Sequence, residues 1–168
     1  MNRLVGAGEA TVEIAVNPQS VSNTEVVGDA VRLDRANRVD FLISLGAMHN
    51  SLDSDITVIG ANDGAGAASA VFATLNYRTK VGTAAWGAWQ QVTDSKIDVV
   101  TGGEIDPAAD DNMILNISVS AAELQDVSAT AKYVNFAISA GGQYAYLVSA
   151  VSVLTGLRYS DDIPPVLV

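Results

Sequence analysis

The sequence predicts an all-β fold: an antiparallel β-sandwich or jelly roll of about eight to ten strands with one short helical turn. Short runs of β-branched and aromatic residues recur along the chain, and in several of them apolar and polar residues alternate. Turn-forming Gly, Pro, Asn and Asp residues separate these runs. No helix-length amphipathic pattern alternates with the strands, so a parallel α/β sheet is not expected.

The alternation is clearest in the run 113–119, where every odd-numbered residue is apolar while Asn116 and Ser118 lie on the opposite face. Such a run predicts a half-buried strand with one solvated face. The run 133–139 shows the same alternation. The expected strands, in chain order, are residues 11–16, 39–45, 56–60, 71–78, 97–100, 113–119, 133–139 and 144–154.

Local motifs mark the boundaries of these strands. Ser120 and Glu123 have the spacing of a capping box, which predicts a helix of one or two turns directly after the strand 113–119. Gly141-Gly142 joins the last two long strands, so a tight hairpin turn with positive φ is expected there. The stretch 17–20 (Asn-Pro-Gln-Ser) is expected to break the first strand. Further turns are expected at 62–64, 102–103, 106–107 and 110–112.

Three segments differ in character along the chain. Residues 1–25 predict an N-terminal arm with the first strand, residues 26–160 the β-sandwich domain, and residues 161–168 an apolar tail. The tail contains Pro164 and Pro165, which favour an extended, polyproline-like conformation. Because an apolar tail is unfavourable in water, it is expected to pack on its own domain or on a neighbouring subunit.

Composition restricts the class of partner. The chain of 168 residues carries 9 basic and 19 acidic residues, a net charge of −10, which argues against nucleic-acid binding. Hydrophobic residues make up 49% of the chain and charged residues only 17%, below the roughly 25% of typical soluble domains. Either the core is large, or another chain covers part of the apolar surface.

The sequence contains no set of residues for catalysis, a cofactor or a metal. It has no cysteine and a single histidine, His49, which is expected at the surface. The pairs and clusters of aspartates are expected in solvated turns rather than in a calcium site, because none has the spaced ligand pattern of an EF-hand. The run 64–66 (Gly-Ala-Gly) is expected to be a flexible loop and lacks the dinucleotide-binding pattern. No signal peptide or membrane-spanning run is evident, so a soluble protein made in the cytoplasm is expected.

Trp86 and Trp89 are the most informative aromatic residues, lying three positions apart after a strand that carries Tyr77 and Arg78. Three interpretations are open: the rings cap the core beneath a loop, they anchor a protein interface, or they form a stacking platform for sugars. A second candidate feature is the alternation of Arg32, Arg35 and Arg38 with aspartates, which predicts a solvated or interfacial strip of ion pairs.

Several segments carry a resemblance to a known group of proteins. They are Gln19–Val31, Arg38–Ala47, Ala70–Arg78 with the following Trp86-Gly87-Ala88-Trp89, and Val151–Tyr159. Together they resemble small virion structural proteins of tailed bacteriophages, and the resemblance extends from about Gln19 to Tyr159.

The resemblance implies a head decoration or cement protein, a structural and non-enzymatic β-sandwich without cofactor. It implies that the protein is made in the host cytoplasm, lies on the outer head surface of the virion, binds the major capsid protein and associates with itself as a dimer or trimer. Two alternatives stay open: a tail or connector component, and a carbohydrate-binding module with weak glycan affinity through Tyr77, Trp86 and Trp89. Nucleic acid and membrane are not expected as partners. The candidate interface residues are Trp86, Trp89, Tyr77, Arg32, Arg35, Arg38, Ile163, Pro164, Pro165, Val166, Leu167 and Val168.

Overall fold

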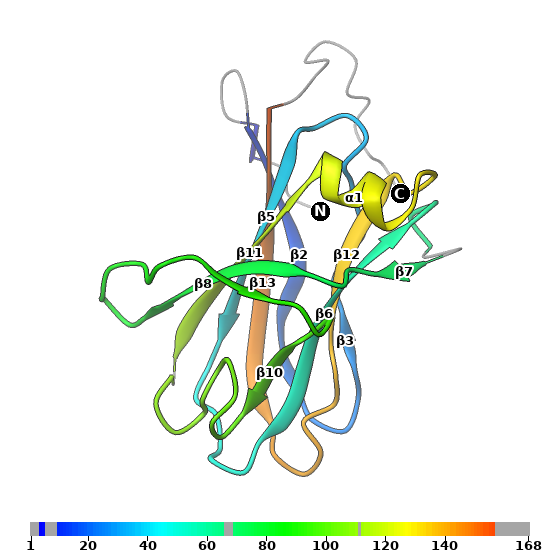
Figure 1. Cartoon of the computed structure of the whole chain (residues 1–168). Coiled ribbons are helices and arrows are strands. Elements are labelled where there is room, and N and C mark those ends of the chain that lie inside the picture. The colour runs from blue at the N-terminus through cyan, green and yellow to red at the C-terminus, as the bar shows by residue number, and fades with distance from the viewer. Residues whose placement is uncertain (1–3, 6–9, 66–68, 111, 157–168) are drawn as a thin grey trace.

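In the computed structural model, which describes residues 4–5, 10–65, 69–110 and 112–156, two antiparallel β-sheets pack face to face (Figure 1). This arrangement confirms the predicted all-β sandwich. Sheet A contains, in order, β1 (Leu4–Val5), β2 (Ala10–Val21), β13 (Tyr146–Thr155), β5 (Arg38–Leu45), β11 (Met113–Ser120), β8 (Leu75–Val81) and β9 (Gln90–Val92). Sheet B contains β10 (Ile97–Val100), β6 (Asp53–Ala61), β12 (Tyr133–Ile138) and β3 (Val26–Val27), with β4 (Val31–Arg32) also paired to β12 and β7 (Ala70–Val71) to β6.

Eight strand positions of this sandwich follow the jelly-roll order. In chain order they are β2, β3 with β4, β5, β6, β10, β11, β12 and β13. In sheet A the neighbours in order are β2, β13, β5 and β11, which are the first, eighth, third and sixth positions. In sheet B they are β3 with β4, then β12, β6 and β10, which are the second, seventh, fourth and fifth positions. The chain therefore changes sheet at every connection except the one from β6 to β10. That connection carries an insertion, β7 to β9, of which β7 pairs with β6 in sheet B while β8 and β9 extend sheet A beyond β11.

One hydrophobic core lies between the sheets. Phe41 of β5 and Phe136 of β12 meet across it edge to face, with their ring centroids 5.3 Å apart. Both are fully buried, and most inward-facing apolar residues of the long strands are buried with them. Leu75 and Tyr77 of β8 belong to the same buried cluster. The inserted strand β8 is therefore packed into the core of the jelly roll.

The predicted helix is confirmed as α1 (Ala121–Val127), between β11 and β12. The Ser120 hydroxyl accepts a hydrogen bond from the Glu123 amide at 3.2 Å, and the Glu123 carboxylate accepts one from the Ser120 amide at 2.6 Å. Leu124 is the buried residue of this helix. It packs against Gly60 of β6, where a Cβ atom would lie 2.8 Å from Leu124 Cδ1. Glycine at this position thus lets the helix approach sheet B.

The predicted hairpin at Gly141-Gly142 is wrong, because β12 lies in sheet B and β13 in sheet A. The two glycines form part of a connection between the sheets. Gly142 does have the expected positive φ, +64°. Gly141 is buried, and a Cβ atom there would lie 2.8 Å from Leu52 Cδ1. Both glycines are therefore explained by local geometry, although the strands they join do not pair.

The first strand is longer than predicted. β2 continues through the stretch 17–20 to Val21, and its register with β13 shifts twice, between Val148 and Ala150 and between Ala150 and Val151. These bulges absorb the extra residues of β2, and Pro18 is exposed in the bulged region. β2 contributes Ala15 and Val16 to the core, so this part of the predicted N-terminal segment is integral to the sandwich.

Other strand boundaries also differ from the prediction. The run 71–78 is divided into β7 and β8, because β7 pairs with β6 in sheet B and β8 pairs with β11 in sheet A. The short strands β1, β3, β4 and β9 were not predicted, since two or three residues carry no readable alternation. The apolar tail 161–168, with Ile163, Pro164, Pro165, Val166, Leu167 and Val168, lies outside the described residues.

Candidate functional site

Trp86 and Trp89 lie on the connection between β8 and β9, residues 82–89, which is drawn in green at the side of the sandwich in Figure 1. Two backbone hydrogen bonds fold this loop back onto β8: Ala84 donates to the Val81 carbonyl at 3.0 Å, and Gly87 to the Thr79 carbonyl at 2.8 Å. A Cβ atom at Gly87 would lie 3.3 Å from that same Thr79 oxygen. Glycine thus allows the close return that brings both indoles to β8.

Arg78 of β8 lies against both tryptophans. Its guanidinium carbon is 4.7 Å from the ring centroid of Trp86 and 4.7 Å from that of Trp89. The guanidinium of Arg38, at the start of β5, lies 5.8 Å from the Trp89 centroid. Each of these distances is within the range of a cation–π contact. We call Arg38, Arg78, Trp86 and Trp89 the Trp–Arg platform.

The four residues of the platform differ in exposure and in charge pairing. Trp89 is 44% exposed, whereas Trp86 is half-buried. Arg38 donates to the Asp40 carboxylate from Nη2 at 2.6 Å and from Nε at 3.1 Å. Arg78 has no carboxylate partner among the described residues, and its buried Nε has no hydrogen-bond acceptor. The platform is therefore an exposed aromatic surface with one uncompensated cation.

On the outer face of sheet A, a row of residues leads away from the platform across the strands. In strand register, Arg78 is followed by Asn116 on β11, Leu42 on β5, Val151 on β13 and Ile14 on β2. The last three are half-buried. Asn116 is 3% exposed and its Oδ1 has no hydrogen-bond partner. Across four strand spacings this row measures about 19 Å, which is the scale of a protein contact rather than of a small pocket.

Tyr77 is not part of the platform, contrary to the prediction that it lies with the tryptophans at the surface. It points into the sandwich and is only 1% exposed. Its hydroxyl donates to Gln90 Oε1 at 2.7 Å, and burial raises the pKa of Tyr77 above its ordinary value. Adjacent residues of a strand face opposite sides, so Arg78 points outward because Tyr77 points inward.

The predicted ion pairs of the arginine segment form, but they do not make one strip. Arg32 donates to Asp34 from Nε at 2.7 Å and from Nη2 at 2.9 Å, and belongs to β4 in sheet B. Arg38 belongs to β5 in sheet A. Between Arg32 and Arg38 the chain crosses from sheet B to sheet A, and Arg35 lies in this connection. Only Arg38 joins the Trp–Arg platform.

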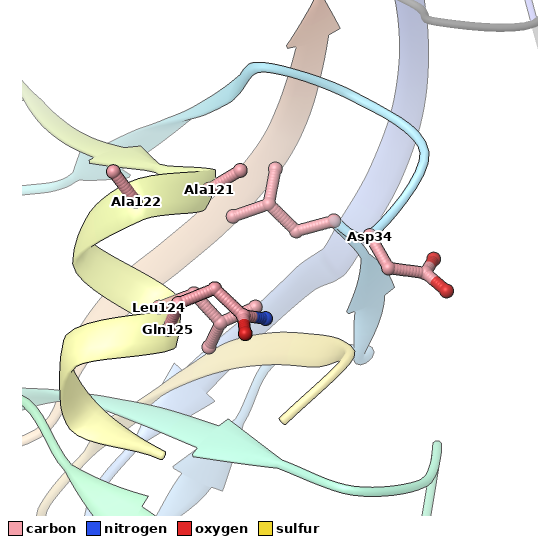
Figure 2. Close-up of a pocket in the computed structure, with 6 residues that line it drawn as sticks. Asp34, Ala121, Ala122, Leu124 and Gln125 are labelled. Atoms are coloured by element: carbon pink, nitrogen blue, oxygen red, sulfur yellow. The ribbon is translucent and has the colours of Figure 1, made fainter. Parts of the chain in front are cut away.

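A separate hollow of about 220 Å³ lies beside α1. Figure 2 shows α1 on one side of it and the connection that carries Asp34 on the other, with the Asp34 carboxylate directed away from the helix. The Asp34 carboxylate accepts hydrogen bonds from Arg32, and this interaction lowers the pKa of Asp34 below 3.8, its ordinary value. The lining thus offers no titratable group free for chemistry. Its residues are Leu33, Asp34, Ala121, Ala122, Leu124 and Gln125.

The remaining charged and titratable groups are dispersed. His49 is exposed, as predicted, and its ring stacks on Tyr144 at 4.0 Å while Nδ1 accepts a hydrogen bond from the Ser51 amide. Lys96 bridges Asp55 and Asp98 at 3.1 and 2.7 Å. Within the part of the chain that the structure describes, no three His, Cys, Asp or Glu residues gather in a way that could hold a metal ion.

In these same residues, no helix is long and apolar enough to cross a membrane. Comparison with known proteins gives no match, either to a family model or to a curated protein sequence. The Trp–Arg platform is therefore identified by its geometry alone.

Sequence reasoning found the two tryptophans but missed the roles of Arg78 and Asn116. The available signal was the position of Arg78 in β8, where it must face opposite to the apolar Leu75 and Tyr77. Asn116 carried no comparable signal, because its neighbour Arg78 lies 38 positions away in the sequence and is set beside it only by the pairing of β11 with β8.

Proposed function

We propose that this protein is a non-enzymatic structural subunit of a bacteriophage particle, which binds the major capsid protein on the outer head surface and stabilises the shell. The carrying observation is the Trp–Arg platform at one end of a row of half-buried apolar residues, Leu42, Val151 and Ile14, on the outer face of sheet A. Trp and Arg are enriched at the energetic centres of protein interfaces. The resemblance of the sequence to small phage virion proteins supplies the kind of partner, and jelly rolls are common in viral capsid proteins.

Binding of this kind stabilises a shell by linkage. A subunit that binds assembled capsid and not the dissociated capsid protein shifts the disassembly equilibrium toward the intact particle. No catalytic group is needed for this role. The exposed Trp89 ring and the half-buried Leu42 and Val151 would lose their contact with water at such an interface.

The test measures binding to capsids assembled without this chain. We expect the wild-type protein to bind and to raise the melting temperature of the capsids, and W89A to bind at least about tenfold more weakly, as for an interface hot spot. V71A is the matched control, because Val71 is a 49% exposed apolar residue on β7 of the other sheet. A wild-type protein that leaves capsid stability unchanged would contradict the proposal.

A carbohydrate-binding module is the second candidate, and the exposure of Trp89 beside two guanidinium groups favours it. Saturable binding on a glycan array that is lost in W86A and W89A would support this function, and an array without binding would exclude the glycans that it displays. Labelling of intact virions separates the head location from a tail or connector location of the same fold.

A further inference from the structure

Arg78 has no ion-pair partner among the described residues, unlike the arginines that form salt bridges. Arg32 is paired with Asp34, and Arg38 with Asp40. Arg78 instead contacts the rings of Trp86 and Trp89, each at 4.7 Å. Ring contacts of this kind hold a guanidinium in place but do not neutralise its charge. A fixed, uncompensated cation therefore lies at the surface of a protein whose net charge is −10.

The geometry leaves the Arg78 guanidinium without a carboxylate partner among the described residues. A guanidinium that stacks on aromatic rings uses its faces, while its N–H groups point outward in its plane and suit the two oxygens of a carboxylate. Within the described residues no acceptor is bonded to the Arg78 side chain, and its buried Nε is unsatisfied. The neighbouring Asn116, 3% exposed, also has an unsatisfied Oδ1. Of these groups only the N–H donors of Arg78 suit a carboxylate, because the Asn116 oxygen is itself an acceptor.

The surroundings select for negative charge. Lys80 lies two residues from Arg78 on the same outward face of β8, and Arg38 adds a second guanidinium next to Trp89. Two carboxylates bonded to residues of β5 and β8 are engaged: Asp40 accepts from Arg38, and Glu123 accepts from the Ser120 amide and from Asn76. A local positive region on an acidic molecule steers an acidic partner to this face.

We propose that Arg78 is the anchor for a glutamate or aspartate side chain of an acidic segment in the partner protein, with an adjacent apolar side chain of that segment packed on Trp89. This inference rests on the proposed function and specifies the chemistry of its partner. A protein is favoured over a saccharide because a row of half-buried apolar residues, Leu42, Val151 and Ile14, continues from the platform and suits an extended contact.

The test uses two peptides that differ only in charge, N-acetyl-Leu-Glu-amide and N-acetyl-Leu-Gln-amide. They are titrated into the ¹⁵N-labelled full chain at low ionic strength, and the indole N–H signals of Trp86 and Trp89 and the Nε–H signal of Arg78 are followed by NMR. We expect the Glu peptide to bind at least about fivefold more tightly than the Gln peptide. The preference is expected to fall at high salt.

Three variants test the role of Arg78. R78Q is expected to abolish the preference for the Glu peptide, and R78K to retain part of it, since lysine keeps the charge but not the planar fork. R32Q is the matched control, because Arg32 lies in sheet B away from the platform, and it is expected to keep the full preference. Equal binding of the two peptides, or a preference that survives in R78Q, would overturn the proposal.

Two further measurements separate the possible failures. Glucuronate and glucose are titrated in parallel: shifts with glucuronate at concentrations where the Glu peptide gives none would assign the site to acidic saccharides and overturn a protein partner.

R78Q is also tested on the capsids. Undiminished capsid binding by R78Q would overturn the anchor while the proposed function stands, whereas a Glu preference in a wild-type protein that does not bind capsids would overturn the function and leave the carboxylate site.

Discussion

At the scale of single residues, the Arg32–Asp34 ion pair gives the molecule a measurable pH dependence. The hydrogen bond from Arg32 lowers the pKa of Asp34 below its ordinary value of 3.8. A carboxyl whose pKa is lower in the folded state stabilises the fold above its unfolded pKa, and this contribution is lost as the pH falls through the folded pKa. Both side chains are partly exposed, at 37% and 25%, so the pair is worth at most about 1 kcal/mol.

We therefore expect D34N to lower the free energy of unfolding by up to about 1 kcal/mol at pH 7, and the gap from wild type to close as the pH falls below 3.8. Urea denaturation of both proteins across this pH range measures the gap. D94N is the control, because Asp94 is exposed and forms no ion pair with another described residue. A gap that stays constant with pH would show that the effect of D34N is not electrostatic.

At the scale of the element, α1 depends on its capping box, because it is only seven residues long and buries a single side chain, Leu124. We expect S120A to cost about 1 kcal/mol of unfolding free energy, the usual effect of removing a helix N-cap. Ser120 N and Asn76 Nδ2 donate to different oxygens of Glu123, and E123Q keeps one oxygen that can still accept from the Ser120 amide, so its cost should be smaller than that of E123A. Urea denaturation of the three variants compares these costs, and an E123Q as destabilised as E123A would contradict the capping role.

Strands and the helix could be predicted where the sequence signal lies in neighbouring residues, but the pairing of the strands could not. The alternation in 113–119 and the Ser120–Glu123 spacing are contained in a few neighbouring residues, and β11 and α1 form as predicted. Whether β12 and β13 pair depends instead on which side of the core each strand covers. The Gly141-Gly142 motif therefore predicted the positive φ of Gly142 correctly but wrongly predicted a hairpin between the two strands. The candidate site divides in the same way: Trp86 and Trp89 are close in sequence, whereas Arg38 joins the platform, and Asn116 lies beside Arg78, only through strand register.

At the scale of the whole molecule, the jelly roll and its insertion are expected to unfold as one cooperative unit. The chain has two tryptophans, both on the β8–β9 connection, so fluorescence reports on the insertion. Far-UV circular dichroism reports on both sheets. Because Leu75 and Tyr77 of β8 lie in the same core as Phe41 and Phe136, the insertion cannot detach without exposing that core. The two signals should therefore give coincident unfolding curves in urea.

The variant F41A tests this coupling, since Phe41 lies on β5 and contacts Phe136 across the sandwich, outside the insertion. Removing a buried phenylalanine costs about 3–5 kcal/mol, and we expect the fluorescence and dichroism midpoints to fall by the same amount. A fluorescence transition that precedes the dichroism transition, or that F41A leaves in place, would mean that the insertion unfolds independently. In that case the Trp–Arg platform would be carried by a separately folding hairpin, and its binding would be lost before the jelly roll itself unfolds.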